Sequence, residues 1–241
     1  MATSFLKNFL VTFLMPEKCY ERIFVNFHLN GACLKFILNR IVGLFIILDT
    51  FVAQLPQLLK ILWRGSANGL SLTASLLQLY ALSCPVVYAI AHNFPLFAWA
   101  DRLITLTQNV VIVFLILYHR GKTFKGMLLL LACTGVMFLL GSYKVKAVAS
   151  VLQDSSLTAL ALSKGFQAGT NYRNGHTGQL STLSVILSWT GSLGTLYMFL
   201  QDTGSLFETL SHVLSAGLSC VLLAQVLCYR NSIAPTKEKS Q

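Results

Sequence analysis

The sequence predicts an all-α membrane protein with seven transmembrane helices, and three observations lead to that fold class. Of the 241 residues, 55% are apolar and only 11% are charged, and the mean hydropathy is +0.66. A soluble domain carries about 25% charged residues, more than twice this share. Long apolar segments recur along the chain, and a membrane-spanning helix needs about 20 mainly apolar residues. A polar pattern also occurs twice at a constant separation.

Seven segments have the length and composition of membrane helices, and polar or turn-forming residues separate them. They are residues 41–62, 70–91, 99–118, 126–143, 145–171, 180–200 and 206–229. Pro85 predicts a kink in the second segment. The fifth has the weakest pattern because Asp154 and Lys164 interrupt it. In the sixth, Gly191 and Gly194 allow another helix to approach closely.

The segment before the first of these helices is mixed in character. Residues 5–15 suit an amphipathic helix lying on the bilayer, with a signal peptide as the alternative. Cys19 and Cys33 can pair if this segment is lumenal, although two cysteines are a weak disulfide signal. No C-x-x-C pair occurs, and the four other cysteines lie in apolar segments, where they act as small hydrophobic residues.

The repeated pattern consists of two glutamine-bearing segments that lie 110 residues apart. Proline removes a backbone donor, so a helix bends there, and nearby polar side chains must satisfy the freed groups. We therefore expect hinges at both segments, with the glutamines beside the proline satisfying the broken backbone. The shift pairs Gln54 with Lys164, Pro56 with Phe166, Gln57 with Gln167, Leu70 with Leu180 and Ser71 with Ser181.

This shift maps helices one to three onto helices five to seven and leaves the fourth as a linker, in a 3+1+3 layout. Parallel repeats of this kind occur among membrane transporters. The expected organisation is a lumenal or interfacial segment (1–40), a first three-helix repeat (41–118), a linker helix (119–147), a second three-helix repeat (148–229) and a cytosolic tail (230–241).

Basic residues favour a lumenal N-terminus and a cytosolic C-terminus. In that orientation the cytosolic loops hold six of them and the lumenal loops three, as the positive-inside rule requires. The six are Lys60, Arg64, Arg120, Lys122, Lys125 and Arg173, and the three are Arg102, Lys144 and Lys146. Lys237 and Lys239 match the dilysine retrieval signal of endoplasmic reticulum membrane proteins, an address that is read in the cytosol.

The Pro56-Gln57 pair, its counterpart Gln167 and the 3+1+3 layout resemble the PQ-loop family, which includes SWEET-type sugar transporters and lysosomal amino-acid exporters. Phe166 departs from that pattern, because it replaces the second proline. Four longer stretches resemble the mannose-phosphate-dolichol utilization proteins within the family: PEKCY (16–20), SANGLSL (66–72), NFP (93–95) and NYRNGHTGQLS (171–181).

The second resemblance implies a non-enzymatic factor of the endoplasmic reticulum membrane. Such a factor is needed for mannose-phosphate-dolichol, and also glucose-phosphate-dolichol, to serve as donor in lipid-linked oligosaccharide, N-glycan and GPI-anchor synthesis. Dolichol-phosphate sugars and endoplasmic reticulum glycosyltransferases are the implied partners, besides the lipid bilayer. Two alternatives remain open from the residues: a transporter of a small sugar or amino acid, and a scaffold for membrane transferases.

Polar residues inside the expected helices are the candidate contacts for a lipid headgroup or substrate. An unpaired charge at the bilayer centre costs about 2.5–3.5 kcal/mol or more, so Asp49 and Lys164 indicate a functional site by default. The alternative is a neutral Asp49, or Asp49 paired with Lys164. As a point charge with three donors, Lys164 suits a phosphate, unless it extends to the cytosolic interface. Gln108, Asn109 and Gln225 suit sugar hydroxyls or interhelical hydrogen bonds.

Enzymatic, metal-binding and nucleic-acid-binding functions are not expected. The sequence contains no G-x-S-x-G, P-loop or zinc pattern, and no segment outside the apolar stretches is long enough for a soluble catalytic domain. We therefore expect no cofactor and no metal. The net charge of +10 comes from residues that lie mostly between apolar segments, where they anchor loops rather than form a nucleic-acid-binding face.

Overall fold

The computed structural model describes residues 2–28, 31–143, 146–201 and 206–232, and every regular element in these ranges is a helix. The all-α prediction is thus confirmed. The chain divides into two compact units, residues 1–48 and 49–241, and the boundary falls inside the helix α3 (Gly31–Val52). The two units are described separately.

Unit 1 is a short helical segment closed by a disulfide. It contains α1 (Ala2–Phe13), α2 (Glu17–Tyr20), the π-helix η1 (Glu21–Val25) and most of α3. Cys19 and Cys33 form the disulfide, with their Cα atoms 5.6 Å apart. Lys7 Nζ lies 2.9 Å from Glu17 Oε1, and the hydrogen bond and charge of Glu17 raise the pKa of Lys7. The disulfide and this ion pair join α1, α2 and the beginning of α3.

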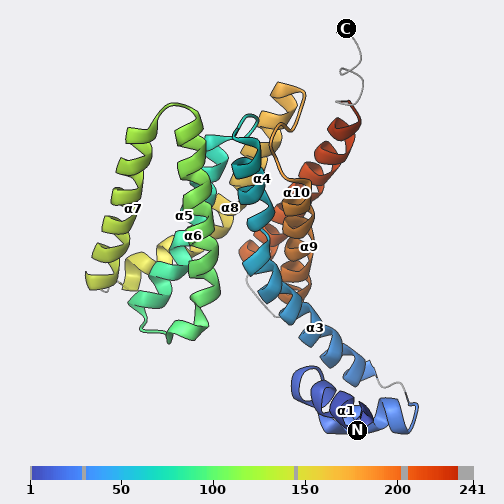
Figure 1. Cartoon of the computed structure of the whole chain (residues 1–241). Helices are drawn as coiled ribbons and strands as arrows, with labels where there is room; N and C mark the ends of the chain where they lie inside the picture. The colour runs from blue at the N-terminus through green and yellow to red at the C-terminus, as the bar shows by residue number, and fades with distance from the viewer. Residues whose placement is uncertain (1, 29–30, 144–145, 202–205, 233–241) are drawn as a thin grey trace. The chain divides into compact units, whose positions relative to one another are not determined.

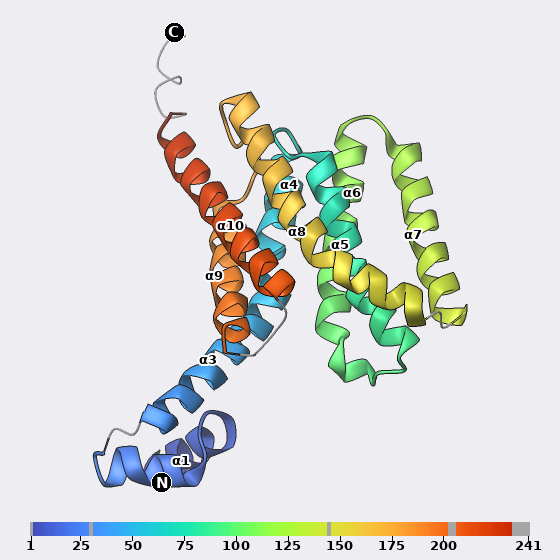
Figure 2. The ribbon, with the colours of Figure 1, turned by 180° about the vertical axis from the view of Figure 1, so that it is seen from behind.

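Unit 2 contains the remaining helices, which pack in neighbouring pairs (Figures 1 and 2). The helix α5 packs along α8, α9 packs on α10, and α6 lies between α5 and α7. The elements are α4 (Leu55–Arg64), α5 (Leu72–Ala91), the 3₁₀ turn η2 (Leu96–Ala98), α6 (Ala100–His119), α7 (Thr123–Tyr143), α8 (Lys146–Asn174), α9 (Thr182–Phe199) and α10 (Leu206–Ser232).

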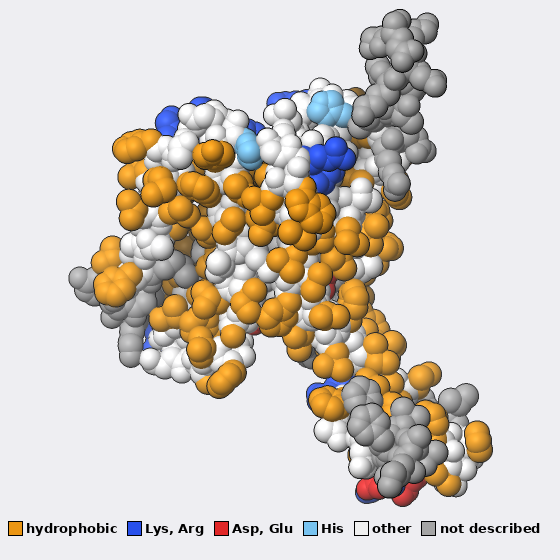
Figure 3. All heavy atoms as spheres, viewed as in Figure 1, with side chains coloured by type: hydrophobic (Ala, Val, Ile, Leu, Met, Phe, Trp, Pro, Cys, Tyr) orange, Lys and Arg blue, Asp and Glu red, His pale blue; other side chains and the backbone are white. Residues whose placement is uncertain are grey.

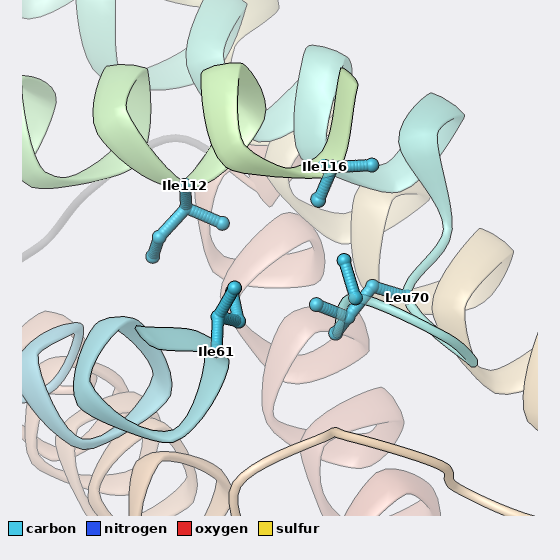
Figure 4. Close-up of a cluster of buried hydrophobic side chains, with 5 residues drawn as sticks. Ile61, Leu70, Ile112 and Ile116 are labelled. Atoms are coloured by element: carbon cyan, nitrogen blue, oxygen red, sulfur yellow. The ribbon is translucent and has the colours of Figure 1, made fainter. Parts of the chain in front are cut away.

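Two buried apolar clusters occupy positions related by the 110-residue shift. In the first, Ile112 and Ile116 of α6 pack with Ile61 and Leu70 (Figure 4). The second joins four residues of α8, α9 and α10, namely Ala168, Val185, Leu222 and Val226, with Leu180 packed against them. Adding 110 to positions 70, 112 and 116 gives 180, 222 and 226, so the shift that the sequence shows in its polar residues also relates apolar core residues.

Four helical segments in the described part of the chain are long and apolar enough to cross a membrane. They are Gly31–Arg64, Leu72–Ala91, Ala100–His119 and Leu206–Tyr229, and α7 holds a shorter apolar stretch, Thr123–Val136. The chain is therefore a multi-pass membrane protein, as its composition predicts. The seven-helix 3+1+3 arrangement stays a prediction, and so do the domain boundaries that depend on it.

The structure corrects two expectations about the glutamine segments. The first helix begins at Gly31 rather than at residue 41, and it ends at Val52, with α4 starting afresh at Leu55. Pro56 lies in the first turn of α4, where a missing N–H does no harm. In contrast, α8 continues through Phe166 and Gln167, so no helix break corresponds to the second expected hinge. Because phenylalanine keeps its N–H, the helical hydrogen-bond ladder need not stop there.

Candidate functional site

Two loops of unit 2 meet at one end of the helices, and each is held by the glutamine that precedes the other loop. The first loop is residues 65–71, between α4 and α5, and the second is residues 175–181, between α8 and α9. Gln57 Nε2 donates to the carbonyl of Gln179 (3.1 Å), and its Oε1 accepts from Ser181 N (2.6 Å). We call this pair of loops with Gln57 and Gln167 the loop seam.

The second half of the loop seam repeats this bonding with the roles exchanged. Gln167 Nε2 donates to the carbonyl of Gly69 (3.1 Å), and its Oε1 accepts from Ser71 N (2.9 Å). Gly69 and Ser71 lie 110 positions before the two residues that Gln57 binds. Each glutamine amide therefore satisfies one carbonyl and one N–H in the opposite loop, and these backbone groups have no helical partner.

Local backbone structure follows the same shift. Gly65 and Gly175 both end a helix with positive φ, 57° and 67°. Ser71 and Ser181 then cap α5 and α9 by accepting from the N–H three residues later, at 3.3 and 3.4 Å. Serine is a favoured N-cap because its oxygen satisfies an unpaired N–H of the first turn. The helices therefore begin at Leu72 and Thr182, two residues after the starts expected from the apolar pattern.

Glycine allows the backbones of the two loops to touch. The N–H of Gln179 donates to the carbonyl of Asn68 at 2.8 Å. A Cβ at Gly69 would lie 2.8 Å from Gly178 Cα, and a Cβ at Gly178 would overlap the carbonyl oxygen of Asn68. Both glycines also have positive φ, 87° and 52°. Any side chain at these positions would push the loops apart.

The α3–α4 break is stabilised from α6, not by the glutamines beside the proline. The last carbonyls of α3 lack helical partners. Thr105 Oγ1 donates to the carbonyl of Thr50 at 2.8 Å, and Gln108 Nε2 donates to that of Phe51 at 3.0 Å. Gln57 instead binds the opposite loop. The expectation that it satisfies the freed backbone is wrong, because its amide is bound to the Gln179 carbonyl and the Ser181 N–H.

Residues 38–98 match the PQ loop repeat family.

The matched region contains the α3–α4 break, Gln57, the first loop and α5, which together form the first half of the loop seam. This PQ-loop repeat suggests a transporter-like or sugar-related function in a membrane. No solved structure matches the chain. The region of the second glutamine, Gln167, lies outside the matched residues, and its correspondence to the PQ-loop repeat rests on the 110-residue shift and the hydrogen bonds above.

Lys164 of α8 lies at the centre of a buried polar cluster and is only 9% exposed. Its Nζ donates to Ser192 Oγ (2.7 Å) on α9 and to Ser215 Oγ (2.8 Å) and Ser219 Oγ (2.7 Å) on α10. An ammonium group has three N–H donors, so all three are directed at hydroxyl oxygens. The cation is hydrogen-bonded by neutral groups, and no carboxylate in the described part of the chain lies within 4 Å of it.

Asp49 interacts electrostatically with Lys164, but the two form no direct ion pair. The Asp49 carboxylate lies against Gly191 of α9, where a Cβ would overlap its Oδ2. Its Oδ1 is buried and has no hydrogen-bond partner in the part of the chain that the structure describes. The expected pairing of Asp49 with Lys164 is therefore a longer-range electrostatic attraction and not a direct ion pair.

The other candidate contacts lie in three places. Gln108 binds the α3–α4 break as described, and its Oε1 is buried without a partner. Asn109, beside it, is 1% exposed, and its Oδ1 also has no partner. Gln225 of α10 instead accepts from Asn171 Nδ2 at 3.0 Å and donates to the carbonyl of Ala168. Since Asn171 also accepts from Gln167 Nε2, Gln225 belongs to the network behind the loop seam.

Several residues of the site were missed in the sequence. Ser192, Ser215 and Ser219 surround Lys164, and Thr105 stabilises the break. A signal was present, because serines recur every four residues along α10 at 211, 215 and 219, which places them on one helix face. Lys237 and Lys239, the predicted retrieval signal, lie outside the described residues.

Basic side chains gather at the end of unit 2 that carries the connection from α6 to α7 (Figure 3). Two of them bind the loop seam: Lys60 Nζ donates to the carbonyl of Leu180 at 2.8 Å, and an Arg120 guanidinium N–H donates to that of Leu70 at 2.8 Å. The segments 60–71, 117–126 and 170–182 contain no acidic residue. These described segments of unit 2 therefore carry positive charge with no acidic residue among them.

Proposed function

We propose that this chain is a non-enzymatic factor of the endoplasmic reticulum membrane that binds the sugar-phosphate head of mannose-phosphate-dolichol, and of glucose-phosphate-dolichol. By moving, presenting or organising this lipid, it keeps the sugar donor accessible to lumenal glycosyltransferases for lipid-linked oligosaccharide, N-glycan and GPI-anchor synthesis. The proposed architecture is 3+1+3: the segment through α4 with α5 and α6, the linker α7, and then α8, α9 and α10.

The observation that carries the proposal is the buried Lys164 ammonium, which is surrounded by serine hydroxyls and has no carboxylate of the described residues within 4 Å. Burial of a charge is costly unless it is compensated. A phosphate would compensate it, since the hydroxyls of Ser192, Ser215 and Ser219 can rotate to donate to phosphate oxygens. In a low-dielectric site such charge-assisted hydrogen bonds are strong.

The first repeat offers a neutral counterpart suited to the sugar. The 110-residue shift relates Lys164, Ser215 and Ser219 to Gln54, Thr105 and Asn109. These are amides and a hydroxyl, and the Oδ1 of Asn109 is buried without a donor. A sugar hydroxyl can supply that donor. The pair of repeats thus offers a cationic half for the phosphate and a neutral half for the sugar.

Three features support the proposed orientation and compartment. The disulfide between Cys19 and Cys33 is typical of an oxidising compartment, which favours a lumenal N-terminus. For the basic end of unit 2, the positive-inside rule favours the cytosol. Lys237 and Lys239, which lie outside the described residues, match a dilysine retrieval signal that is read in the cytosol.

A complementation experiment tests the proposal. Cells depleted of the protein should accumulate lipid-linked oligosaccharide that stops at the cytosolically assembled stage, and wild-type protein should restore extension. Lys164→Met should fail to restore it, whereas Lys164→Arg, which keeps the charge, should restore it in part. Lys35→Met, which alters an exposed lysine of unit 1, is the matched control. Full extension with Lys164→Met at wild-type protein abundance would overturn the proposal.

A transporter of a small amino acid is the second candidate, and Asp49 is the observation that favours it. Its unpartnered Oδ1 and the Lys164 cation form a carboxylate and an ammonium within electrostatic reach of each other. This combination suits the two charges of a zwitterion. Vesicles containing only this protein should then take up the amino acid, and Asp49→Asn should abolish uptake; absence of uptake would exclude this function.

A further inference from the structure

A groove on the outside of unit 2 is unconnected with the Lys164 cluster. It has a volume of about 470 Å³ and lies between α5, α8 and the first turn of α10. Its lining on α8 recurs at positions 151, 154, 155, 158, 159 and 162, which is one face of the helix. Lys164 lies about 200° around the helix from position 162, so it faces α9 and α10 while the groove lies on another side.

One part of the groove is polar and has unused hydrogen-bonding capacity. Asp154 is exposed, and the structure gives its carboxylate no hydrogen-bond or ion-pair partner among the described residues. Thr158, one turn further along α8, is also exposed. Tyr80 of α5 shares a 2.7 Å hydrogen bond with Ser155 Oγ, which in turn donates to the carbonyl of Leu152. The tyrosine oxygen therefore remains available as an acceptor.

The remaining lining is apolar and open. Val151, Leu162 and Phe207 are 68%, 50% and 57% exposed, and Leu77 of α5 completes this part. Exposed apolar side chains of this kind suit contact with a hydrocarbon chain. The carboxylate beside them does not suit hydrocarbon, because a charge facing lipid tails costs several kcal/mol. The groove therefore needs an occupant with a polar head and an apolar body.

The charge of the groove restricts the head further. Among the described residues no lysine, arginine or histidine lines it, and the carboxylate of Asp154 repels phosphate. A head with several hydroxyl donors suits a carboxylate that has free acceptor positions, two oxygens with about four lone-pair sites. A sugar meets this condition.

We propose that this groove binds the neutral sugar head of a membrane glycolipid. The sugar hydroxyls donate to Asp154 and to the Tyr80 oxygen, and the hydrocarbon chain lies along Val151, Leu162 and Phe207. The site is separate from the Lys164 cluster and does not depend on the function proposed for it. It differs in chemistry as well, because it selects against the phosphate that the Lys164 cluster favours.

Native mass spectrometry of the full chain, purified in an amine-oxide detergent without a sugar head, tests this proposal. The probes are monoglucosyldiacylglycerol, diacylglycerol without the sugar, and phosphatidylglycerol. Wild-type protein should retain the glucosyl lipid about tenfold more strongly than either other lipid, the ratio expected from a hydrogen bond to a charged group. Equal retention of diacylglycerol, or stronger retention of phosphatidylglycerol, would overturn the proposal.

Variants locate the binding. Asp154→Ala should reduce retention of the glucosyl lipid about tenfold and leave the circular dichroism spectrum unchanged, because its carboxylate holds no other group in place. Asp101→Ala, on α6 and outside the groove, is the matched control. If Asp154→Ala and Asp101→Ala retain the lipid equally, the groove is not the site. A dimer mass that disappears in Asp154→Ala would instead show that a second copy of the chain covers this face.

Discussion

The exchange of glutamines across the loop seam leads to a quantitative prediction for Gln57→Leu. Leucine matches the buried volume but removes the bonds to Gln179 and Ser181, and Gln57 is only 5% exposed. Two lost hydrogen bonds account for about 1–3 kcal/mol, and leaving the buried Ser181 N–H without a partner adds to this. We expect the free energy of unfolding to fall by about 2–4 kcal/mol.

The matched control is Gln54→Leu, three residues earlier and on the other side of Pro56. The structure gives the half-buried Gln54 side chain no hydrogen-bond partner among the described residues. Its replacement should change the free energy of unfolding by no more than about 0.5 kcal/mol. The assay for both variants is equilibrium unfolding in mixed detergent micelles with increasing sodium dodecyl sulfate. Far-ultraviolet circular dichroism follows the loss of helix and gives the free energy of unfolding.

The double variant Gln57→Leu/Gln167→Leu then tests whether the two halves act together. Gln57 holds the second loop and Gln167 the first, and the two loops touch through their backbones. Loss of either glutamine therefore loosens both loops. We expect the double variant to lose about 1 kcal/mol less than the sum of the single variants. Strict additivity, or a Gln57→Leu effect no larger than that of Gln54→Leu, would refute the cooperative seam.

Two further predictions concern close packing in unit 2, and both are measured by the same unfolding assay. Gly178→Ala should lower the free energy of unfolding by at least about 1–3 kcal/mol. The new Cβ would overlap the Asn68 carbonyl oxygen, and the positive φ of this position strains alanine as well. An unchanged free energy of unfolding would mean that the loops do not touch. Gly191→Ala should lower the free energy of unfolding by about 1–3 kcal/mol, because the new Cβ displaces the Asp49 carboxylate. The double variant Gly191→Ala/Asp49→Ala should recover most of this loss, since it removes the displaced carboxylate.

The sequence predicts where along the chain the two loops lie, because the ends of their helices depend on local chemistry. Gly65 and Gly175 end helices, and Ser71 and Ser181 begin them, for reasons that lie within a few residues of each position. The constant shift of 110 residues follows from these local features. Neither feature requires knowledge of which helices pack together.

The destinations of Gln57 and Lys164 could not be predicted in the same way. Gln57 binds residues 122 and 124 positions away, and Lys164 binds residues 28 to 55 positions away. Such contacts depend on how the helices pack, which a single sequence does not specify. The start of α3 at Gly31 was missed for another reason. A hydropathy pattern identifies only the apolar part of a helix, and Lys35 and Arg40 interrupt that pattern although both residues favour helix formation.

The helix is broken at the first glutamine segment and continuous at the second, and this difference determines where unit 2 can bend. The loop seam fixes the repeats to each other at one end, since four hydrogen bonds from two buried glutamines and a backbone contact hold it. At the α3–α4 break, in contrast, the helix is interrupted, and the carbonyls of Thr50 and Phe51 accept side-chain bonds from Thr105 and Gln108. At the second glutamine segment, α8 is continuous. Movement that opens the Lys164 cluster should therefore bend the first repeat about the break and leave the loop seam closed.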